Sequence, residues 1–319
     1  FLIIRSNIYE KSNYIIIDYQ SNMNIQNVYI LEDRGILYVN GLDAKDFLQN
    51  LITNDIHKVS DKCSCFASLL TPQGKYLYDF LVVKHKSGYF IDCAKEQTDD
   101  LYKQLSLYKL RSKIEILNLS NEFVVAAFNY EKLMKFDEAN DSPGFTFRYR
   151  EDPIFLDPRN KMLGGRLIIN LEKLYLSLKK LGLNVADTKE YYELSHSLGI
   201  PQKNMKKLQN KLFGIECNFD ELNGIDFKKG CYVGQENTAR IKLKNKITKR
   251  LLPIKIIKGN INKDDVIFDK NVDIGRILID EDHPFALIKI TSKKFNFNTM
   301  YTTNSATLKI IKPNWLNLS

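Results

Sequence analysis

The sequence contains no long apolar run, and this absence excludes a membrane-spanning helix from the expected elements. Such a helix needs about 18 or more consecutive apolar residues, and the 319-residue chain has no such run although 44% of it is hydrophobic. With 27% charged residues, the composition is typical of a globular protein. The length favours two or three packed subdomains over one small core. We therefore expect no membrane partner.

Cysteines and histidines are few and form no metal-binding pattern. The five cysteines lack the dense, even spacing of small secreted proteins, which favours a reducing compartment. The four histidines form no i,i+4 pair and no acid accompanies them, so neither a metal site nor a triad is predicted. Cys63 and Cys65 would share one face of a strand. No second pair completes four ligands, so we favour core packing over a metal pair.

Positive charge exceeds negative charge, and one segment concentrates it. The net charge of +9 favours anionic partners, but lysine-rich composition alone is weak evidence for them. In ARIKLKNKITKR (239–250), Arg240 and three lysines alternate with other residues, so a strand there would carry a positive ridge able to follow a phosphate chain. The alternative is an edge strand whose lysines prevent aggregation.

The first part of the chain alternates strand and helix patterns. A strand ends at Gly41, and Asp43 is then placed to cap a helix that ends near Thr53. Two apolar runs meet at the Pro-Gln-Gly turn of 72–74 and predict a β-hairpin. Leucines at helical spacing predict a further helix over 95–110. This order is typical of an α+β subdomain.

A second passage of strands and helices follows from about residue 118. After a strand at 164–170, leucines recur on one helical stripe, at Leu171, Leu174, Leu178 and Leu181. Asp187 and Glu190 form a capping-box pattern for the next helix. We therefore predict a second α+β subdomain.

The last part of the chain has a different texture. From residue 251 onward, short apolar runs alternate with turn residues at roughly ten-residue intervals, which predicts a small antiparallel β-barrel. The expected organisation is an α+β region over 24–250, split near 118, and a barrel over 251–319. Residues 1–23 are expected to be a poorly defined extension.

The extension bears on the expected location. Glu10 and Asp18 suit a mitochondrial transit peptide poorly, because such peptides contain few acidic residues. We therefore expect the bacterial cytoplasm, with the mitochondrial matrix as the alternative.

A Walker-type phosphate loop is also absent. In GIDFKKGCYVGQE (224–236) five residues separate Gly224 from Gly230, and no Gly-Lys-Ser/Thr follows. What remains is the thiol of Cys231, two residues after Lys229, where a cation favours the thiolate and a glycine permits close approach. Two interpretations stay open: Cys231 is a reactive thiol, or it packs inward beside turn glycines.

The segment FKKGCYVGQENTAR (227–240) resembles the signature of the YgfZ family. These proteins are folate-binding relatives of the glycine-cleavage aminomethyltransferase that support iron-sulfur cluster assembly, and the mitochondrial member acts on 4Fe-4S proteins. The matching positions are Lys229, Gly230, Cys231, Tyr232, Gly234, Gln235, Glu236 and Arg240. Further family landmarks follow in order: FLQNLITND (47–55), LTPQGKYLYD (70–79), YKLRSKI (108–114), DPRNKMLGGR (157–166), LGIP (198–201) and GIECNFDEL (214–222).

The resemblance implies two α+β subdomains and a barrel around a central opening that binds tetrahydrofolate. Asp79 is the first folate-binding candidate, because it matches an acidic position that the aminomethyltransferases use near the pterin. Tyr108, Arg111, Glu216 and Arg240 are further candidates, with Arg111 as a partner for the folate glutamate.

The resemblance also implies a functional thiol. In the leading hypothesis the chain is a folate-binding accessory protein, whose partners are the iron-sulfur assembly machinery or client 4Fe-4S proteins. Cys231 is its functional thiol, Lys229 stabilises the thiolate, and Gln235 and Glu236 orient the loop. No resident metal is expected.

One departure weakens a transferase assignment. Before LGIP the aminomethyltransferases typically have an arginine and a glutamate, whereas this chain has Ser195 and Ser197. A folate-dependent aminomethyl- or methyltransferase, with tRNA as one acceptor, is therefore the alternative hypothesis. A folate-binding scaffold without thiol chemistry is the third.

Overall fold

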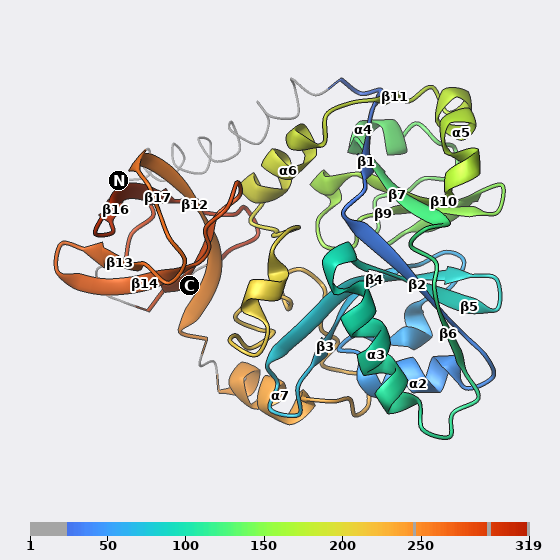
Figure 1. Ribbon diagram of the computed structural model, residues 1–319, viewed down its shortest axis with the longest axis horizontal. Helices are drawn as coiled ribbons and strands as arrows, with labels where there is room; N and C mark the ends of the chain where they lie inside the picture. Colours follow the sequence, from blue (N-terminus) through green and yellow to red (C-terminus); the bar gives the residue numbers. More distant parts are fainter. Residues whose placement is uncertain (1–23, 245–246, 292–294, 318–319) are drawn as a thin grey trace.

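The computed structural model describes residues 24–244, 247–291 and 295–317, so the extension expected at 1–23 lies outside the described residues. The described chain forms two mixed layers of sheet and helix and a closed β-barrel (Figure 1). The predicted α+β fold with a C-terminal antiparallel barrel is therefore confirmed.

The first sheet has five antiparallel strands in the order β3-β4-β5-β2-β6. The strands are β2 Arg34–Asn40, β3 Cys65–Leu70, β4 Tyr76–His85, β5 Gly88–Ala94 and β6 Glu115–Asn118. Helices α2 (Ala44–Leu51) and α3 (Thr98–Lys109) cover one face through an apolar cluster. Short 3-10 turns η1 (Ile56–Lys58) and η2 (Lys95–Gln97) precede β3 and α3. The Pro-Gln-Gly turn joins β3 to β4, as predicted.

The second sheet has six strands in the order β11-β1-β7-β10-β9-β8. They are β1 Asn27–Leu31, β7 Phe123–Phe128, β8 Thr146–Tyr149, β9 Asp152–Leu156, β10 Gly165–Asn170 and β11 Asn184–Val185. The accompanying helices are α4 (Tyr130–Leu133), α5 (Leu174–Lys180) and the 3-10 turns η3 (Lys161–Leu163) and η4 (Leu171–Lys173). Strand β1 pairs with β7, with Val28 opposite Phe128. The chain therefore enters the second sheet before it builds the first.

The inner faces of the two sheets share one core with helix α6 (Thr188–Ser197). Leu81 from the first sheet, Ile168 from the second and Tyr191 from α6 all belong to it. Asp187 caps α6 by accepting from the backbone N–H of Lys189, but Glu190 accepts from the hydroxyl of Tyr29 instead of completing a capping box. The predicted N-cap at Asp187 is thus confirmed, whereas the predicted capping box with Glu190 does not form.

A segment with little regular structure leads from α6 to the barrel. It contains η5 (Met205–Leu208) and ends in helix α7 (Gln235–Leu243). The strand predicted within 239–250 is wrong for residues 239–243, which belong to α7, because a helix turns alternate side chains to different sides. Lys246 lies outside the described residues. Arg240 instead pairs with Glu236, and Lys242 pairs with Asp220.

The barrel closes in the order β12-β15-β14-β13-β16-β17. Its strands are β12 Lys249–Gly259, β13 Val266–Asp269, β14 Val272–Ile279, β15 Phe285–Lys289, β16 Met300–Thr302 and β17 Ala306–Ile310. Beyond β17 the chain returns to the end of α6, where Trp315 Nε1 donates to the carbonyl of Leu198 at 2.7 Å. A ring nitrogen of His196 on α6 also lies 2.9 Å from the carbonyl of Pro284 in the barrel. The barrel is thereby fixed to α6.

Three local predictions differ from the structure. The side chain of Asp43 does not cap α2, because its carboxylate accepts from the backbone N–H of Lys113 at 2.6 Å. Leu171 precedes α5 and is 50% exposed, so the apolar stripe begins at Leu174. Cys63 lies outside β3 and does not extend its face with Cys65.

Candidate functional site

The signature loop, residues 224–234, lies against the end of α2 and the β3–β4 turn. Gly234 has φ of +83°, and a Cβ there would lie 2.5 Å from the carbonyl oxygen of Thr71. Only glycine suits such a conformation and contact. Thr53 ties the other end of the loop, because its hydroxyl donates to the carbonyl of Gly224 at 2.6 Å. Both ends of the loop are therefore fixed by the first sheet and its helices.

The ammonium group of Lys229 holds the middle of the loop. Its Nζ donates to the carbonyl oxygens of Gln49, Ile52 and Asn54 at 2.7, 2.6 and 2.9 Å. These groups lie at the C-terminal end of α2, where helix carbonyls lack partners and attract cations. Because a lysine ammonium has three protons, all of them are used. The structure thus gives Lys229 partners other than the expected Cys231 thiolate.

The environment of Lys229 makes its charge costly. Burial lowers the pKa of this lysine to about 8, although the negative charges of Asp55 and Asp226 act in the opposite direction. The ring of Tyr232 lies 5.1 Å from Nζ, and burial raises the pKa of Tyr232 to about 12. The chain therefore keeps a desolvated cation beneath the loop, where it binds backbone carbonyls.

Cys231 is exposed, in contrast to the buried lysine two residues before it. Its neighbour Gly230 faces open space, since a Cβ there would meet no atom within 4 Å. The other cysteines differ: Cys65, Cys93 and Cys217 are buried, and burial raises the pKa of each thiol. Among the described residues, no group of three or more histidines, cysteines or acids could hold a metal. Cys231 is thus an exposed thiol that belongs to no such group among the described residues.

The remaining signature residues shape the start of α7. Gln235 is its first residue, and its backbone N–H donates to the carbonyl of Tyr232 at 3.2 Å. Glu236 forms an exposed i,i+4 ion pair with Arg240 at 2.7 Å. The side chains of Glu236 and Arg240 therefore contact each other on the outer surface of the helix.

Asp79 lies on the inner face of the first sheet. It is 8% exposed, and its Oδ1 accepts from the hydroxyl of Tyr76 at 2.7 Å. The thiol of Cys217 lies within electrostatic reach of both Asp79 and Glu216. Two of the predicted folate-binding acids, Asp79 and Glu216, therefore lie in the same region of the molecule, near Tyr76 and Cys217.

An unsatisfied amide lies beside the same group. The hydroxyl of Tyr76 is next to the side chain of Gln97, whose amide is buried and makes no well-formed hydrogen bond. A buried amide without partners costs free energy, and a polar ligand would relieve that cost. The amide of Gln97 and the carboxylate of Asp79 suit a heterocycle that carries amino and N–H donors and a carbonyl acceptor. Neither Asp79 nor Gln97 lines the hollows beside His196, Arg111 and Phe47.

Two other predicted folate residues lie on the opposite side of the sheet. Tyr108 packs with the helix-covered cluster that contains Tyr78 and Phe80, the two strand neighbours of Asp79. Adjacent residues of a strand point to opposite faces, so the sheet separates Tyr108 from Asp79. Arg111 follows α3 on that outer side and is exposed. The predicted set is thus divided among three places, because Arg240 lies apart from both groups on α7.

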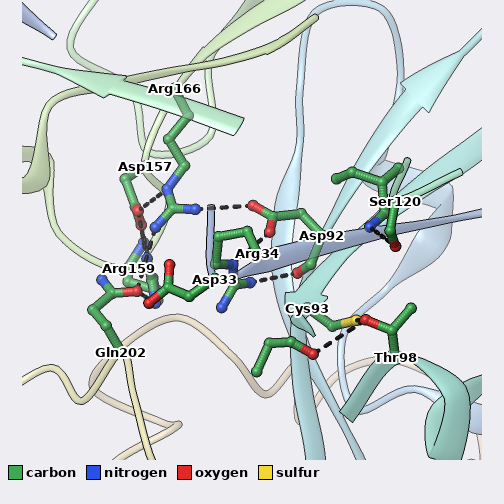
Figure 2. Close-up of polar contacts among 12 residues, drawn as sticks. Asp33, Arg34, Asp92, Cys93, Thr98, Ser120, Asp157, Arg159, Arg166 and Gln202 are labelled. Carbon is green, nitrogen blue, oxygen red and sulfur yellow. Dashed lines mark hydrogen bonds and ion pairs between the residues drawn. The ribbon is translucent and has the colours of Figure 1, made fainter. Parts of the chain in front are cut away.

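A buried charge network, which the sequence did not predict, crosses the interface between the sheets (Figure 2). Arg166 on β10 donates to Asp92 on β5 and to Asp157, both at 2.9 Å. Asp92 also accepts from Arg34 at 2.6 Å, and Asp157 accepts from Arg159 at 2.7 Å. Arg166, Asp92 and Asp157 have no exposed surface. The sequence did contain one sign of this network, because Asp92 and Arg166 are charged residues inside the apolar runs GYFIDCA and GGRLIIN.

The electrostatics of the network keep it ionised. Burial alone would raise the pKa of Asp157, but the charges of Arg159 and Arg166 outweigh it and lower the pKa to about 2. Three guanidinium groups share two carboxylates, and the excess donors reach Gln202 and Tyr191. Breaking such a buried network leaves an uncompensated charge. The network therefore joins the two sheets and fixes how they are placed relative to each other.

Of the two serines that depart from the transferase pattern, Ser195 extends this network through Gln202 and Ser197 does not. Ser195 is buried, donates to the carbonyl of Ile200 at 2.6 Å and accepts from Gln202 at 3.1 Å. Ser197 donates to the carbonyl of Leu194 at 2.7 Å. Both hydroxyls are therefore engaged in local structure.

The chain is similar to known proteins that share one name and come from several organisms. No protein-family model matches the chain. It is 30% identical over 233 residues to the iron-sulfur cluster assembly factor IBA57 homolog, mitochondrial, of Neurospora crassa, covering 70% of this chain and 52% of that protein. It is 30% identical over 241 residues to the factor of Homo sapiens (71% and 65%) and 27% identical over 270 residues to that of Dictyostelium discoideum (76% and 66%). The chain spans about half to two thirds of these relatives.

A solved structure shares the fold. The glycine cleavage system aminomethyltransferase T from Bartonella henselae superposes with a TM-score of 0.72, over 94% of this chain and 89% of that one. The two sequences are 12% identical, so the likeness concerns the fold alone. The aminomethyltransferase fold expected from the signature is thereby confirmed.

These comparisons correct one expectation and leave another without support. The expected cytoplasmic location is contradicted, because the three relatives are all named mitochondrial. None of the names refers to tRNA. Along the described residues, no helix combines the length and apolar character needed to cross a lipid bilayer.

Proposed function

We propose that this chain is a mitochondrial iron-sulfur cluster assembly factor of the YgfZ type, with Cys231 as its functional thiol. The similarity to IBA57 proteins from three distant organisms supports the process. The signature loop supports the residue, because its glycines, Lys229 and Cys231 lie in the part of the chain that carries the resemblance.

The proposal rests on one observation: the thiol of Cys231 is exposed on a loop that the buried Lys229 holds in place. Cysteine thiolates are the ligands that iron-sulfur clusters take from proteins. Because Cys231 belongs to no group of three or more candidate ligands among the described residues, it would supply one ligand to a cluster in transit. The remaining ligands come from the assembly machinery or from a client 4Fe-4S protein. Gly230 leaves open space for that approach.

A folate is the second part of the proposal. The buried carboxylate of Asp79 and the buried amide of Gln97 would bind the pterin of a tetrahydrofolate on the inner face of the first sheet. Glu216, which lies near the same group, adds a further acceptor. Arg111 and Tyr108 are left out of this site because the sheet lies between them and Asp79.

Complementation tests the thiol. In cells that lack the endogenous factor, we expect Cys231→Ala to abolish recovery of 4Fe-4S enzyme activity while the purified variant keeps its folded-state circular dichroism. Cys63→Ala is the matched control, because Cys63 is a partly exposed thiol outside the loop. Full recovery with Cys231→Ala would reduce this cysteine to a surface residue and refute the proposal.

Titration tests the folate site separately. We expect tetrahydrofolate to quench intrinsic fluorescence in the native chain and Asp79→Asn to weaken that binding at least about tenfold, as for a lost charged hydrogen bond. Cys231→Ala should bind normally. Unchanged affinity in Asp79→Asn would exclude the inner face as the site.

The fold keeps one alternative in view, a folate-dependent aminomethyltransferase. The TM-score of 0.72 to such an enzyme favours it, whereas the structural engagement of Ser195 and Ser197 gives no catalytic pair in place of the arginine and glutamate. Turnover of methylenetetrahydrofolate by the purified chain with an aminomethyl donor would decide for the alternative.

A further inference from the structure

One corner of the molecule is built from two segments that hold each other in place. The turn 41–43 meets the loop 110–113, because Lys113 N–H donates to the carboxylate of Asp43 at 2.6 Å. Figure 1 shows the loop between α3 and β6 projecting at the lower edge of the first layer. We name this feature the leucine corner, after Leu42, Leu107 and Leu110.

The three leucines are far more exposed than apolar side chains usually are. Leu42 and Leu110 are each 87% exposed and Leu107 is 71% exposed. Leu110 also has φ of +43°, a conformation that costs free energy for a residue other than glycine. Strain that keeps an apolar side chain in water is unexpected unless something covers that side chain.

Cations without partners surround the leucines. Lys45, Lys109, Arg111 and Lys113 lie within the same two segments or next to them, and none forms an ion pair among the described residues. The nearest acid, Asp43, is engaged with a backbone N–H. An open hollow between the segments is lined by Asp43, Leu110, Arg111 and Ser112. Asp46, next to Lys45, lines a neighbouring hollow and leaves the cations in excess by number. The corner is therefore apolar at its tip and positive around it.

We propose that the leucine corner docks on an anionic lipid surface. Leucines on a projecting tip can enter the boundary between head groups and acyl chains, while flanking lysines and arginines remain at the level of the phosphates. The exposed guanidinium of Arg111 can bind a lipid phosphate through two hydrogen bonds. A protein partner would need a pocket that accepts three separate projecting leucines. This peripheral contact departs from the expectation of no membrane partner, which concerned spanning helices.

Docking in this way would orient the signature loop. Helix α2 begins beside the corner, and the carbonyl of Asn50 near its other end accepts from the backbone N–H of Val233 at 3.3 Å. Eight helical residues span about 12 Å. The loop that carries Cys231 would therefore be held close to the lipid surface. The lipid proposal stands on the corner alone and does not depend on the thiol chemistry.

Vesicle sedimentation tests the proposal with the full chain. We expect binding to vesicles of phosphatidylcholine mixed with phosphatidylserine and little binding to phosphatidylcholine alone. Leu42→Ser with Leu110→Ser should abolish binding, and Arg111→Glu with Lys113→Glu should weaken it at least about tenfold, since each basic residue near such a surface contributes about fivefold. Leu176→Ser is the matched control, because Leu176 is a 58% exposed leucine among lysines on α5.

Each other outcome overturns the proposal. Equal binding to neutral vesicles would remove the role of the cations, and loss of binding in Leu176→Ser alone would move the contact to α5. No binding to either vesicle, together with a dimer in sedimentation velocity that Leu110→Ser dissociates, would make a second copy the occupant. The charge-reversal pair provides a second measure if the leucine variants lose their melting transition.

Discussion

The network between the sheets and the signature loop both depend on buried cations, yet they differ in what they leave exposed. In the network every charged group faces another charged or polar group, and Arg166 has no exposed surface. In the loop the buried cation, Lys229, donates its hydrogen bonds to backbone carbonyls, and Cys231 remains exposed. The first arrangement fixes two layers, whereas the second fixes a short segment and leaves its thiol free to react.

The largest expected effect comes from breaking the network. Arg166→Met leaves Asp92 and Asp157 with fewer partners in a buried setting, and we expect it to lower the free energy of unfolding by about 3–5 kcal/mol. Urea denaturation followed by circular dichroism measures the change. Arg240→Met is the control, because its ion pair with Glu236 is exposed and should contribute less than about 0.5 kcal/mol. Equal effects of the two variants would contradict the comparison.

The next effect concerns Lys229. Lys229→Met removes three hydrogen bonds and leaves the carbonyls at the end of α2 without partners, so we expect a loss of about 2 kcal/mol in unfolding free energy. Cys231 should then react with a thiol reagent at a different rate, because its loop is no longer held. Lys229→Arg is the control, since it keeps the charge. An unchanged labelling rate in Lys229→Met would show that the loop needs no such tie.

A smaller effect is expected at the contact of α6 with the barrel. Burial lowers the pKa of His196 to about 4, with the Pro284 carbonyl acting in the opposite direction. The unfolded chain therefore binds this proton near pH 6.5 and the folded chain only near pH 4. Stability should therefore fall as pH decreases from about 6.5 to about 4. His196→Gln should flatten that slope in melting curves between pH 7 and 4, and an identical slope would assign it to other groups.

The smallest effect is expected at the thiol itself. Cys231 makes no described contact that its loss would break, so Cys231→Ser should change the free energy of unfolding by less than about 0.5 kcal/mol. The native chain should have one fast-reacting thiol, and this variant should lose it. Mass spectrometry of the labelled, folded protein would identify the residue. Fast labelling at buried Cys217 would instead indicate an open core.

The sequence identified elements more reliably than contacts. Turn residues at 72–74 and the leucine spacing in α3 predicted their elements because local rules decide them. The stretch from Arg240 onward was predicted as a strand because its lysines alternate, whereas residues 240–243 belong to α7. The family resemblance pointed to the signature and Asp79, but it could not place Tyr108 on the opposite side of the sheet, because Tyr108 lies on α3 and its side is set by the face that this helix covers. The network required residues from β2, β5 and β10 to meet, which no local pattern indicates.

Strand β1 is synthesised first but belongs to the second sheet, and this order affects folding during synthesis. Strand β1 pairs with β7 about 100 residues later, at Val28 and Phe128. At roughly 5–20 residues per second of synthesis, β1 waits on the order of 5–20 s on the ribosome before its partner emerges. The five-stranded layer can form during that time while β1 remains an open edge. A chaperone that shields this strand would therefore raise the yield of folded protein more than one that acts after release.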